Sequence, residues 1–178
     1  MKLRRSARRA FLVAHVTFSV SWLGLSLGLL ALAVTAATTG STGAMEASYR
    51  SMKVFTDWLI LPVALITLGT GLVLSLGTRW GLAQHRWVYT KFWLTLVTTA
   101  ASAFALRPGV NDAAAQAVAG VPVESAARLI APPLVSLSAY AFMTAVSVLK
   151  PWGLTRRGRK ARSSARKPVD AEGLRQTA

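Results

Sequence analysis

The sequence contains no cysteine. This absence excludes disulfide bonds, thiolate metal sites, cysteine-attached haem and thiol redox chemistry. A metal site would need histidine, methionine or oxygen ligands, but the chain has only two histidines and four methionines. Met45 and Met52 bracket one loop, and the methionines form no spaced series of soft ligands, so copper transfer has little support.

Acidic residues are also scarce. The chain has 6 Asp and Glu against 21 Lys and Arg, for a formal net charge of +15. The sequence has no paired carboxylates, nucleophilic triad or phosphate-binding loop, which favours a protein that is not an enzyme and leaves catalytic residues unknown. The bases gather at the two ends of the chain, so the charge indicates membrane topology. Nucleic acid is not an expected partner, because no aromatic residues alternate with these bases to stack on nucleotides.

A long apolar run occupies residues 11–37, and His15 is its only ionisable residue. This run is long enough to cross a bilayer and predicts an integral membrane protein. A cleaved signal peptide is the alternative, since residues 8–12 resemble the core of a twin-arginine export signal. The run, however, is about twice the length of a signal core.

The hydropathy pattern predicts an all-α fold, a transmembrane four-helix bundle within a membrane domain at residues 11–153. The expected spans are about 11–37, 54–76, 88–106 and 126–149. Arg107, Pro108 and Gly109 predict the end of the third span. Pro132 and Pro133 are expected to distort the first turns of the fourth.

The distribution of bases predicts cytoplasmic N and C termini. Residues 1–10 form a basic N-terminus, residues 77–87 a basic loop, and residues 154–178 a basic tail expected to be disordered. The two basic ends are expected to contact anionic lipid. Trp80, Trp87 and Trp152 are predicted at the inner interface, and Tyr49 and Trp58 at the outer one.

A short surface helix is expected in the second outer loop. Asn111 and Asp112 offer a cap, residues 113–119 favour a helix, and Gly120 predicts its end. Asp57 is expected to cap the second span at the outer face.

Two polar stripes begin at the cytoplasmic ends of the first and third spans. The first contains His15, Ser19, Trp22 and Ser26, and the third contains Lys91, Thr95, Thr98 and Ser102. The spacing places each set on one helix face, with His15 and Lys91 at similar depth. If the two helices are neighbours, His15 and Lys91 could converge on one pocket.

These stripes also have simpler interpretations. Hydroxyl groups bond back to their own helix, and small residues such as the Gly24 and Gly28 pair let membrane helices pack closely. Lys91 could extend to the headgroups, and His15 could bond a backbone carbonyl. His85 lies among basic and aromatic residues and is expected to contact lipid phosphate. Further hydroxyls on the second and fourth spans could line an interior; they include Thr67, Thr70, Ser75, Ser136, Thr144 and Ser147.

The motifs around residues 15–24, 77–81 and Lys91 resemble those of uncharacterised bacterial four-helix integral membrane proteins related to the copper-resistance D domain. More distantly they are similar to the haem-carrying membrane protoporphyrinogen oxidases. The resemblance implies a bacterial cytoplasmic membrane location, a haem-iron or copper contact at His15, and Lys91 as its polar partner. The chain lacks the arginine that the oxidase pattern has after Trp22.

Three functions follow as hypotheses. The first is a non-enzymatic assembly or accessory protein of the inner membrane, acting with a membrane protein partner or as a homo-oligomer. The second is a haem-binding redox protein, in which His15, Lys91 and Trp22 form the cofactor site and His15 is the metal ligand. The third is transport of a small solute or copper by an oligomer.

Overall fold

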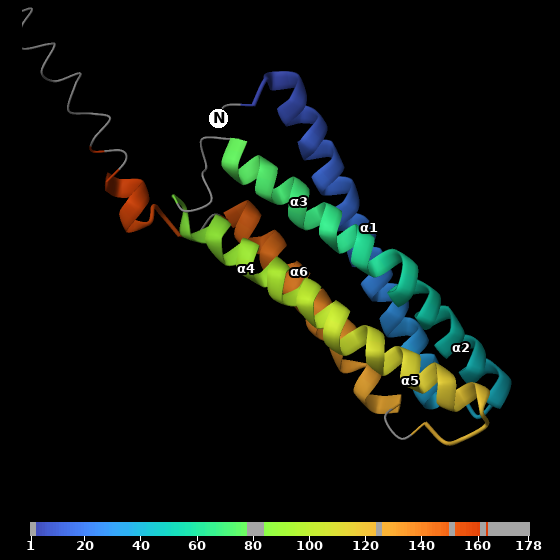
Figure 1. The fold of residues 1–178 in the computed structure, drawn as a ribbon. Coiled ribbons are helices and arrows are strands. Elements are labelled where there is room, and N and C mark those ends of the chain that lie inside the picture. Colours follow the sequence, from blue (N-terminus) through green and yellow to red (C-terminus); the bar gives the residue numbers. More distant parts are fainter. Residues whose placement is uncertain (1–2, 78–83, 124–125, 150–151, 161–162, 164–178) are drawn as a thin grey trace, which may run out of the picture.

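The computed structural model describes residues 3–77, 84–123, 126–149, 152–160 and 163, and every regular element in these ranges is helical (Figure 1). The predicted all-α fold is therefore confirmed for this part of the chain. Trp80, which was predicted at the inner interface, lies outside the described residues.

The first helix, α1, spans Arg5–Thr38. It includes the predicted span 11–37 and begins among the basic residues that precede it. Its buried positions recur every three or four residues, which gives one face toward the rest of the molecule. These positions are Trp22, Ser26, Leu29, Ala33 and Ala36.

The second long helix starts earlier than the sequence indicated. It comprises α2 (Thr42–Val54), a π-helical segment η1 (Phe55–Ile60) and α3 (Leu61–Gly77), which form one continuous helix of 36 residues. The Ser41 side chain caps its start by accepting a hydrogen bond from the Ala44 N–H at 3.3 Å. The helix thus extends about one dozen residues before the predicted span of 54–76, because the polar residues after Thr42 are helical as well.

A third long helix comprises α4 (Arg86–Ala101), the π-helical segment η2 (Ser102–Leu106) and α5 (Arg107–Val118). The helix continues past Leu106, so the expectation that Pro108 and Gly109 break it there is wrong. Each π segment ends two residues before a proline, Pro62 or Pro108. A proline has no N–H to donate to the preceding helical turn. The wider π turn changes the hydrogen-bond pattern just before the proline, so the helix continues past it.

The segment predicted as a surface helix is therefore the end of this third helix. Asn111 and Asp112 do not cap it, because it has already begun at Arg107 as α5. Val110, Ala113, Ala114 and Ala117 are buried in α5, which packs against α2. Gly120 ends the helix as predicted, with a φ of 67° in the left-handed region.

The last long element contains a 3₁₀ turn, η3 (Ala126–Leu129), and helix α6 (Ala131–Leu149). Pro132 and Pro133 lie in the first turn of α6, where missing N–H groups are tolerated. The expected distortion is present as the 3₁₀ turn.

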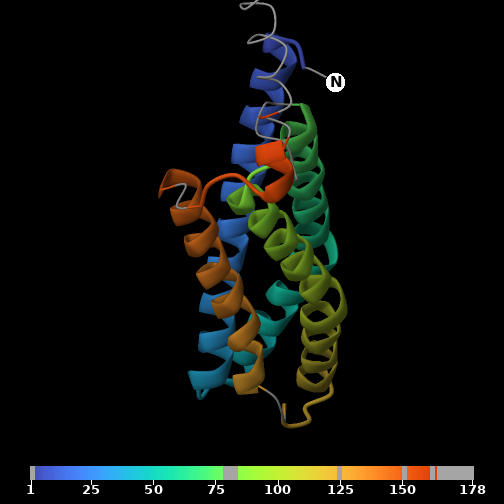
Figure 2. The same cartoon turned by 90° about the vertical axis from the view of Figure 1, so that its left-hand side faces the viewer.

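The long helices lie side by side in an elongated arrangement (Figures 1 and 2). The start of α1 and residues 152–160 lie at one end, near the end of α3 and the start of α4. Thr155 N–H bonds to the Gln84 carbonyl at 2.8 Å and holds part of the basic tail against the start of the third helix. Residues 156–160 are helical, whereas disorder was expected for 154–178, and residues 164–178 lie outside the described part.

Three helices are long and apolar enough to cross a membrane: Arg5–Thr38, Thr42–Gly77 and Ala126–Leu149. The predicted third span, 88–106, is not among them. Lys91 and several hydroxyl residues make it more polar than the others. The findings support a membrane protein with three such helices in the described ranges.

Aromatic residues at the predicted outer interface differ in environment. Trp58 is 75% exposed, as expected for a ring that faces lipid or headgroups. Tyr49 is fully buried between the helices, so its predicted interfacial position is wrong. Tyr49 lies on the buried face of α2 together with Ser48 and Met52.

Candidate functional site

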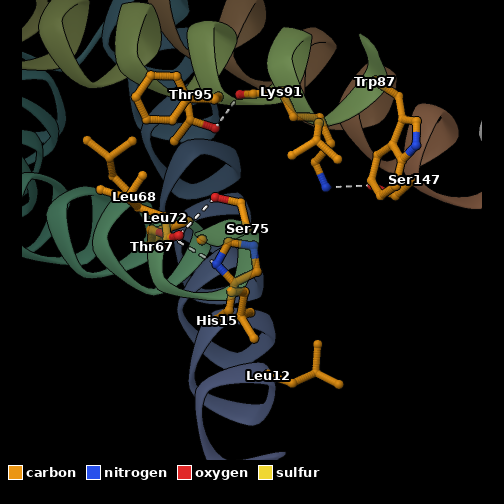
Figure 3. A pocket seen from close by; sticks show the side chains of 14 residues that line it. Leu12, His15, Thr67, Leu68, Leu72, Ser75, Trp87, Lys91, Thr95 and Ser147 are labelled. Carbon is orange, nitrogen blue, oxygen red and sulfur yellow. Dashed lines mark hydrogen bonds between the residues drawn. The ribbon is translucent and has the colours of Figure 1, made fainter. Parts of the chain in front are cut away.

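A pocket of about 300 Å³ lies between α1, α3, α4 and α6 (Figure 3). His15 from α1 and Lys91 from α4 both line it. Most of the wall is apolar and includes Leu68, Leu72 and Phe92. His15 and Lys91 thus line one pocket, although this was expected only if their helices were neighbours, and α1 and α4 instead both pack against α3.

The His15 ring is fixed against α3. Its Nδ1 lies 3.1 Å from the Thr67 carbonyl oxygen and 3.1 Å from the Thr70 hydroxyl oxygen. The ring fits because residue 71 is glycine: a Cβ there would lie 3.0 Å from His15 Cε1. The contact with a backbone carbonyl agrees with the simpler interpretation of His15, yet it uses only one of the two ring nitrogens.

Lys91 points into the protein. Its Nζ donates a hydrogen bond to the Ser147 hydroxyl on α6 at 2.6 Å. The Ser147 hydroxyl donates in turn to the Met143 carbonyl at 2.7 Å. The expected extension of Lys91 to the headgroups therefore does not occur in this structure, because Ser147 lies within reach on the neighbouring helix.

The hydroxyl stripes are mainly packing features. Ser19 donates to the His15 carbonyl, and Thr95, Thr98 and Ser102 each donate to a carbonyl four residues earlier. Thr67 differs, because its hydroxyl oxygen is buried with no hydrogen-bond partner among the described residues. Thr67 lines the pocket beside His15, so an unsatisfied polar atom belongs to the wall.

Trp22 does not belong to the pocket. Its side chain is 1% exposed and packs edge-on against Tyr140, with ring centroids 5.2 Å apart. It shares the inward face of α1 with His15, as predicted, but lies two helical turns farther along. Its predicted contribution to a cofactor site is not supported, because a core ring at that level does not reach the pocket.

The remaining candidates lie elsewhere. His85 precedes α4, with its ring 6.3 Å from that of Trp87. Met45 and Met52 both lie on α2, and Met52 is fully buried in the core. Among the described residues, no three His, Cys, Asp or Glu side chains gather as a metal site.

An ionic cluster joins the two long interrupted helices at their π segments. Asp57 Oδ2 accepts a hydrogen bond from Lys53 at 2.7 Å, and its Oδ1 accepts one from Arg107 at 2.8 Å. Lys53 also donates to the Asn111 side chain at 2.8 Å. Asp57 was expected to cap a helix start, but it lies within a continuous helix and pairs with cations instead.

The polar positions on the second and fourth spans, which the sequence indicated as able to line an interior, supply part of the pocket wall. Thr67, Gly71 and Ser75 recur every four residues on α3, and all three line the pocket together with Ser147. Two features of the wall were not predicted: Trp87 lines the pocket, and Gly71 leaves the space that the imidazole occupies. Both depend on which helices are neighbours.

Comparison of this chain with protein-family models, with curated proteins and with solved structures finds no match. The resemblance to proteins related to the copper-resistance D domain stays a prediction that rests on short motifs.

Proposed function

We propose that the protein crosses the bacterial cytoplasmic membrane four times, with both termini in the cytoplasm. The exposed basic residues at one end of the molecule support this orientation, because positive charge is retained on the cytoplasmic side. They come from the start of α1 and from the segment after α6, and they include Arg8, Arg9, Arg156, Arg157 and Arg159. Anionic lipid is the expected partner of this end.

The third crossing in this proposal is residues 86–106. Its polar side chains turn inward to Ser147 or to their own helix, while Trp93, Val97 and Phe104 are exposed. Exposed apolar side chains next to inward-facing polar ones are what a lipid-facing helix requires.

In this four-crossing topology, α2 and α5 lie outside the bilayer. A helix of 36 residues is about 54 Å long, whereas the hydrocarbon core is about 30 Å thick. The charged residues Glu46, Arg50 and Lys53 all lie on α2, so this is the part of the helix that remains in water. The ionic cluster at Asp57 would then mark the outer membrane surface.

The absence of native cysteine makes the topology directly testable. We expect Gly40→Cys to react with a membrane-impermeant maleimide in intact cells, and Gln84→Cys to react only after the membrane is permeabilised. The reverse pattern would refute the proposed orientation, and labelling of both sites in intact cells would refute a crossing between residues 40 and 84.

We further propose a non-enzymatic accessory protein that holds a small lipid-soluble molecule in the pocket between α1, α3, α4 and α6. The observation that carries this proposal is the meeting of His15 and Lys91 in one apolar pocket. Polar groups inside a membrane are costly, and a few convergent polar groups in an apolar pocket are typical of ligand sites.

Haem is the cofactor that the resemblance implies. His15 fits an iron ligand in one respect, since Nδ1 faces a backbone carbonyl and Nε2 is left for coordination. The pocket does not fit the whole group, because about 150 Å³ already accommodates benzene and a porphyrin is far larger than twice that size. A Soret band in purified protein supplied with haem, lost in His15→Ala, would overturn our preference for a smaller ligand.

Binding of a two-ring aromatic compound tests the proposed function. We expect 2-naphthoic acid to release binding heat with protein in nanodiscs above the blank of empty nanodiscs. Leu72→Trp, which fills the pocket from α3, should abolish this heat, whereas Leu76→Trp on the exposed side of α3 should retain it. Equal heats for wild type and Leu72→Trp would exclude the pocket as the binding site.

A further inference from the structure

We infer that the ligand is a small lipid-soluble weak acid, bound through its acidic group between His15 and Lys91. This inference rests on the proposed function and specifies the chemical class that the pocket accepts.

The hydrogen bonds around His15 determine which ring nitrogen carries the proton. The Thr70 hydroxyl lies 2.7 Å from the Ile66 carbonyl and donates to it, so its oxygen accepts on the side of the imidazole. The Thr67 carbonyl also accepts. Both neighbours of Nδ1 are therefore acceptors, and Nδ1 carries the hydrogen of the neutral ring. Nε2 then presents a lone pair.

Figure 3 shows the second ring nitrogen of His15 on the side of the ring away from Thr67. The hydrogen bonds of the ring with described residues involve Nδ1, and none of them involves Nε2. The pocket thus offers one strong acceptor that is suited to an acidic O–H group.

Lys91 offers the complementary donors. An ammonium group has three N–H donors, and Ser147 accepts one of them. The described wall of the pocket contains no Asp or Glu. A ligand oxygen can accept from the remaining donors and supply the negative charge that the site lacks.

A carboxylic acid satisfies both groups at once. Its O–H donates to His15 Nε2, and its second oxygen accepts from Lys91 Nζ. If the O–H bond breaks, the proton forms a new N–H bond on Nε2, and the carboxylate lies between imidazolium and ammonium. The proton takes part in a hydrogen bond whether it is on the acid oxygen or on His15 Nε2. The site is therefore complementary to both the neutral acid and its carboxylate.

The size and lining of the pocket restrict the rest of the ligand. A volume of about 300 Å³ corresponds to roughly two benzene rings, since about 150 Å³ holds one. Leu68, Leu72 and Phe92 provide an apolar surface for this body. A two-ring aryl acid or a medium-chain alkyl acid fits these limits.

The test compares 2-naphthoic acid with 2-methylnaphthalene, which has nearly the same shape and no acidic group. Binding to the full chain in nanodiscs is measured by calorimetry, with empty nanodiscs as the blank. We expect the acid to bind at least ten-fold more tightly than the hydrocarbon. Lys91→Met and His15→Phe should each reduce this ratio by about ten-fold, a loss of about 1.4 kcal/mol.

Lys160→Met is the matched control, because Lys160 is exposed in the segment after α6 and does not line the pocket. It should leave the ratio unchanged. Gel filtration of each variant identifies protein that has lost its fold, and the ratio of the two affinities is insensitive to a general loss of active protein.

The two proposals fail in different ways. Equal affinities for acid and hydrocarbon, both lost in Leu72→Trp, would overturn the weak-acid inference and leave a ligand pocket. A preference for the acid that survives both Lys91→Met and His15→Phe would also overturn the inference. Absence of binding by either compound would overturn the proposed function itself.

Discussion

Gly71 on α3 provides the space in which the His15 ring lies. A Cβ atom at residue 71 would be 3.0 Å from His15 Cε1 and 3.4 Å from Nδ1, closer than ordinary carbon contacts of about 3.5–4.0 Å. The hydrogen bond from Nδ1 to the Thr67 carbonyl depends on this close approach. One glycine on α3 thus sets the position of the imidazole from α1.

The first prediction concerns this glycine. Gly71→Ala should shift the imidazole by a few tenths of an ångström and weaken binding of 2-naphthoic acid by about three- to ten-fold, because binding groups need placement within about 0.5 Å. Gly69→Ala is the control, since a Cβ there has no neighbour within 4 Å. Calorimetry in nanodiscs measures both. Equal affinities in the two variants would show that Gly71 does not position His15.

The second prediction separates Trp22 from the pocket. Trp22→Ala should lower the free energy of unfolding by about 3–5 kcal/mol, because the ring is buried against Tyr140. Trp58→Ala should have a small effect, since Trp58 is 75% exposed. Thermal unfolding in detergent, followed by circular dichroism, makes this comparison.

Trp22→Phe provides a functional check of the same residue. It retains an aromatic ring in the core, so we expect its affinity for 2-naphthoic acid to equal that of wild type. A selective loss of affinity in this variant, with its thermal stability retained, would restore Trp22 as a ligand contact.

The sequence was informative where the signal was local. The apolar run at 11–37 predicted α1, and Gly120 predicted the end of α5. The three- and four-residue spacing of polar residues identified the inward faces of α1 and α4. These features depend on composition and periodicity along one segment.

The errors arose where neighbouring helices decide the outcome. Pro108 and Gly109 predicted a helix end, but a π segment just before Pro108 lets the helix continue and pack on α2. The direction of Lys91 depends on Ser147, which is 56 residues away in sequence. Neither fact can be read from the residues adjacent to Pro108 or Lys91, because both result from tertiary packing.

The third prediction concerns the ionic cluster at Asp57. Asp57→Asn removes the charge that pairs with Lys53 and Arg107, and we expect it to lower the free energy of unfolding by about 1–2 kcal/mol. The Asp57 side chain is 15% exposed, so water screens the pairs only in part. Thermal unfolding in detergent at low salt measures the change.

Glu46→Gln is the control for this cluster. Glu46 pairs with Arg50 at 2.8 Å, but within one helix and with side chains that are 37% and 63% exposed. The expected loss is about 0.3–0.5 kcal/mol, as for other exposed pairs four residues apart. Losses of equal size in the two variants would mean that Asp57 does not join the two long helices.

The fourth prediction concerns the turn after α5. Gly120 has a φ of 67°, and this left-handed conformation costs a residue with a Cβ about 1–2 kcal/mol. Gly120→Ala should destabilise the protein by that amount, although no atom lies within 4 Å of the added Cβ. Gly40→Ala, in the turn between α1 and α2, has equally open surroundings and should change stability by less than about 0.5 kcal/mol. Because both substitutions meet open space, a difference between their unfolding temperatures reports backbone conformation alone. Equal unfolding temperatures would show that the chain can leave α5 without a left-handed residue at position 120.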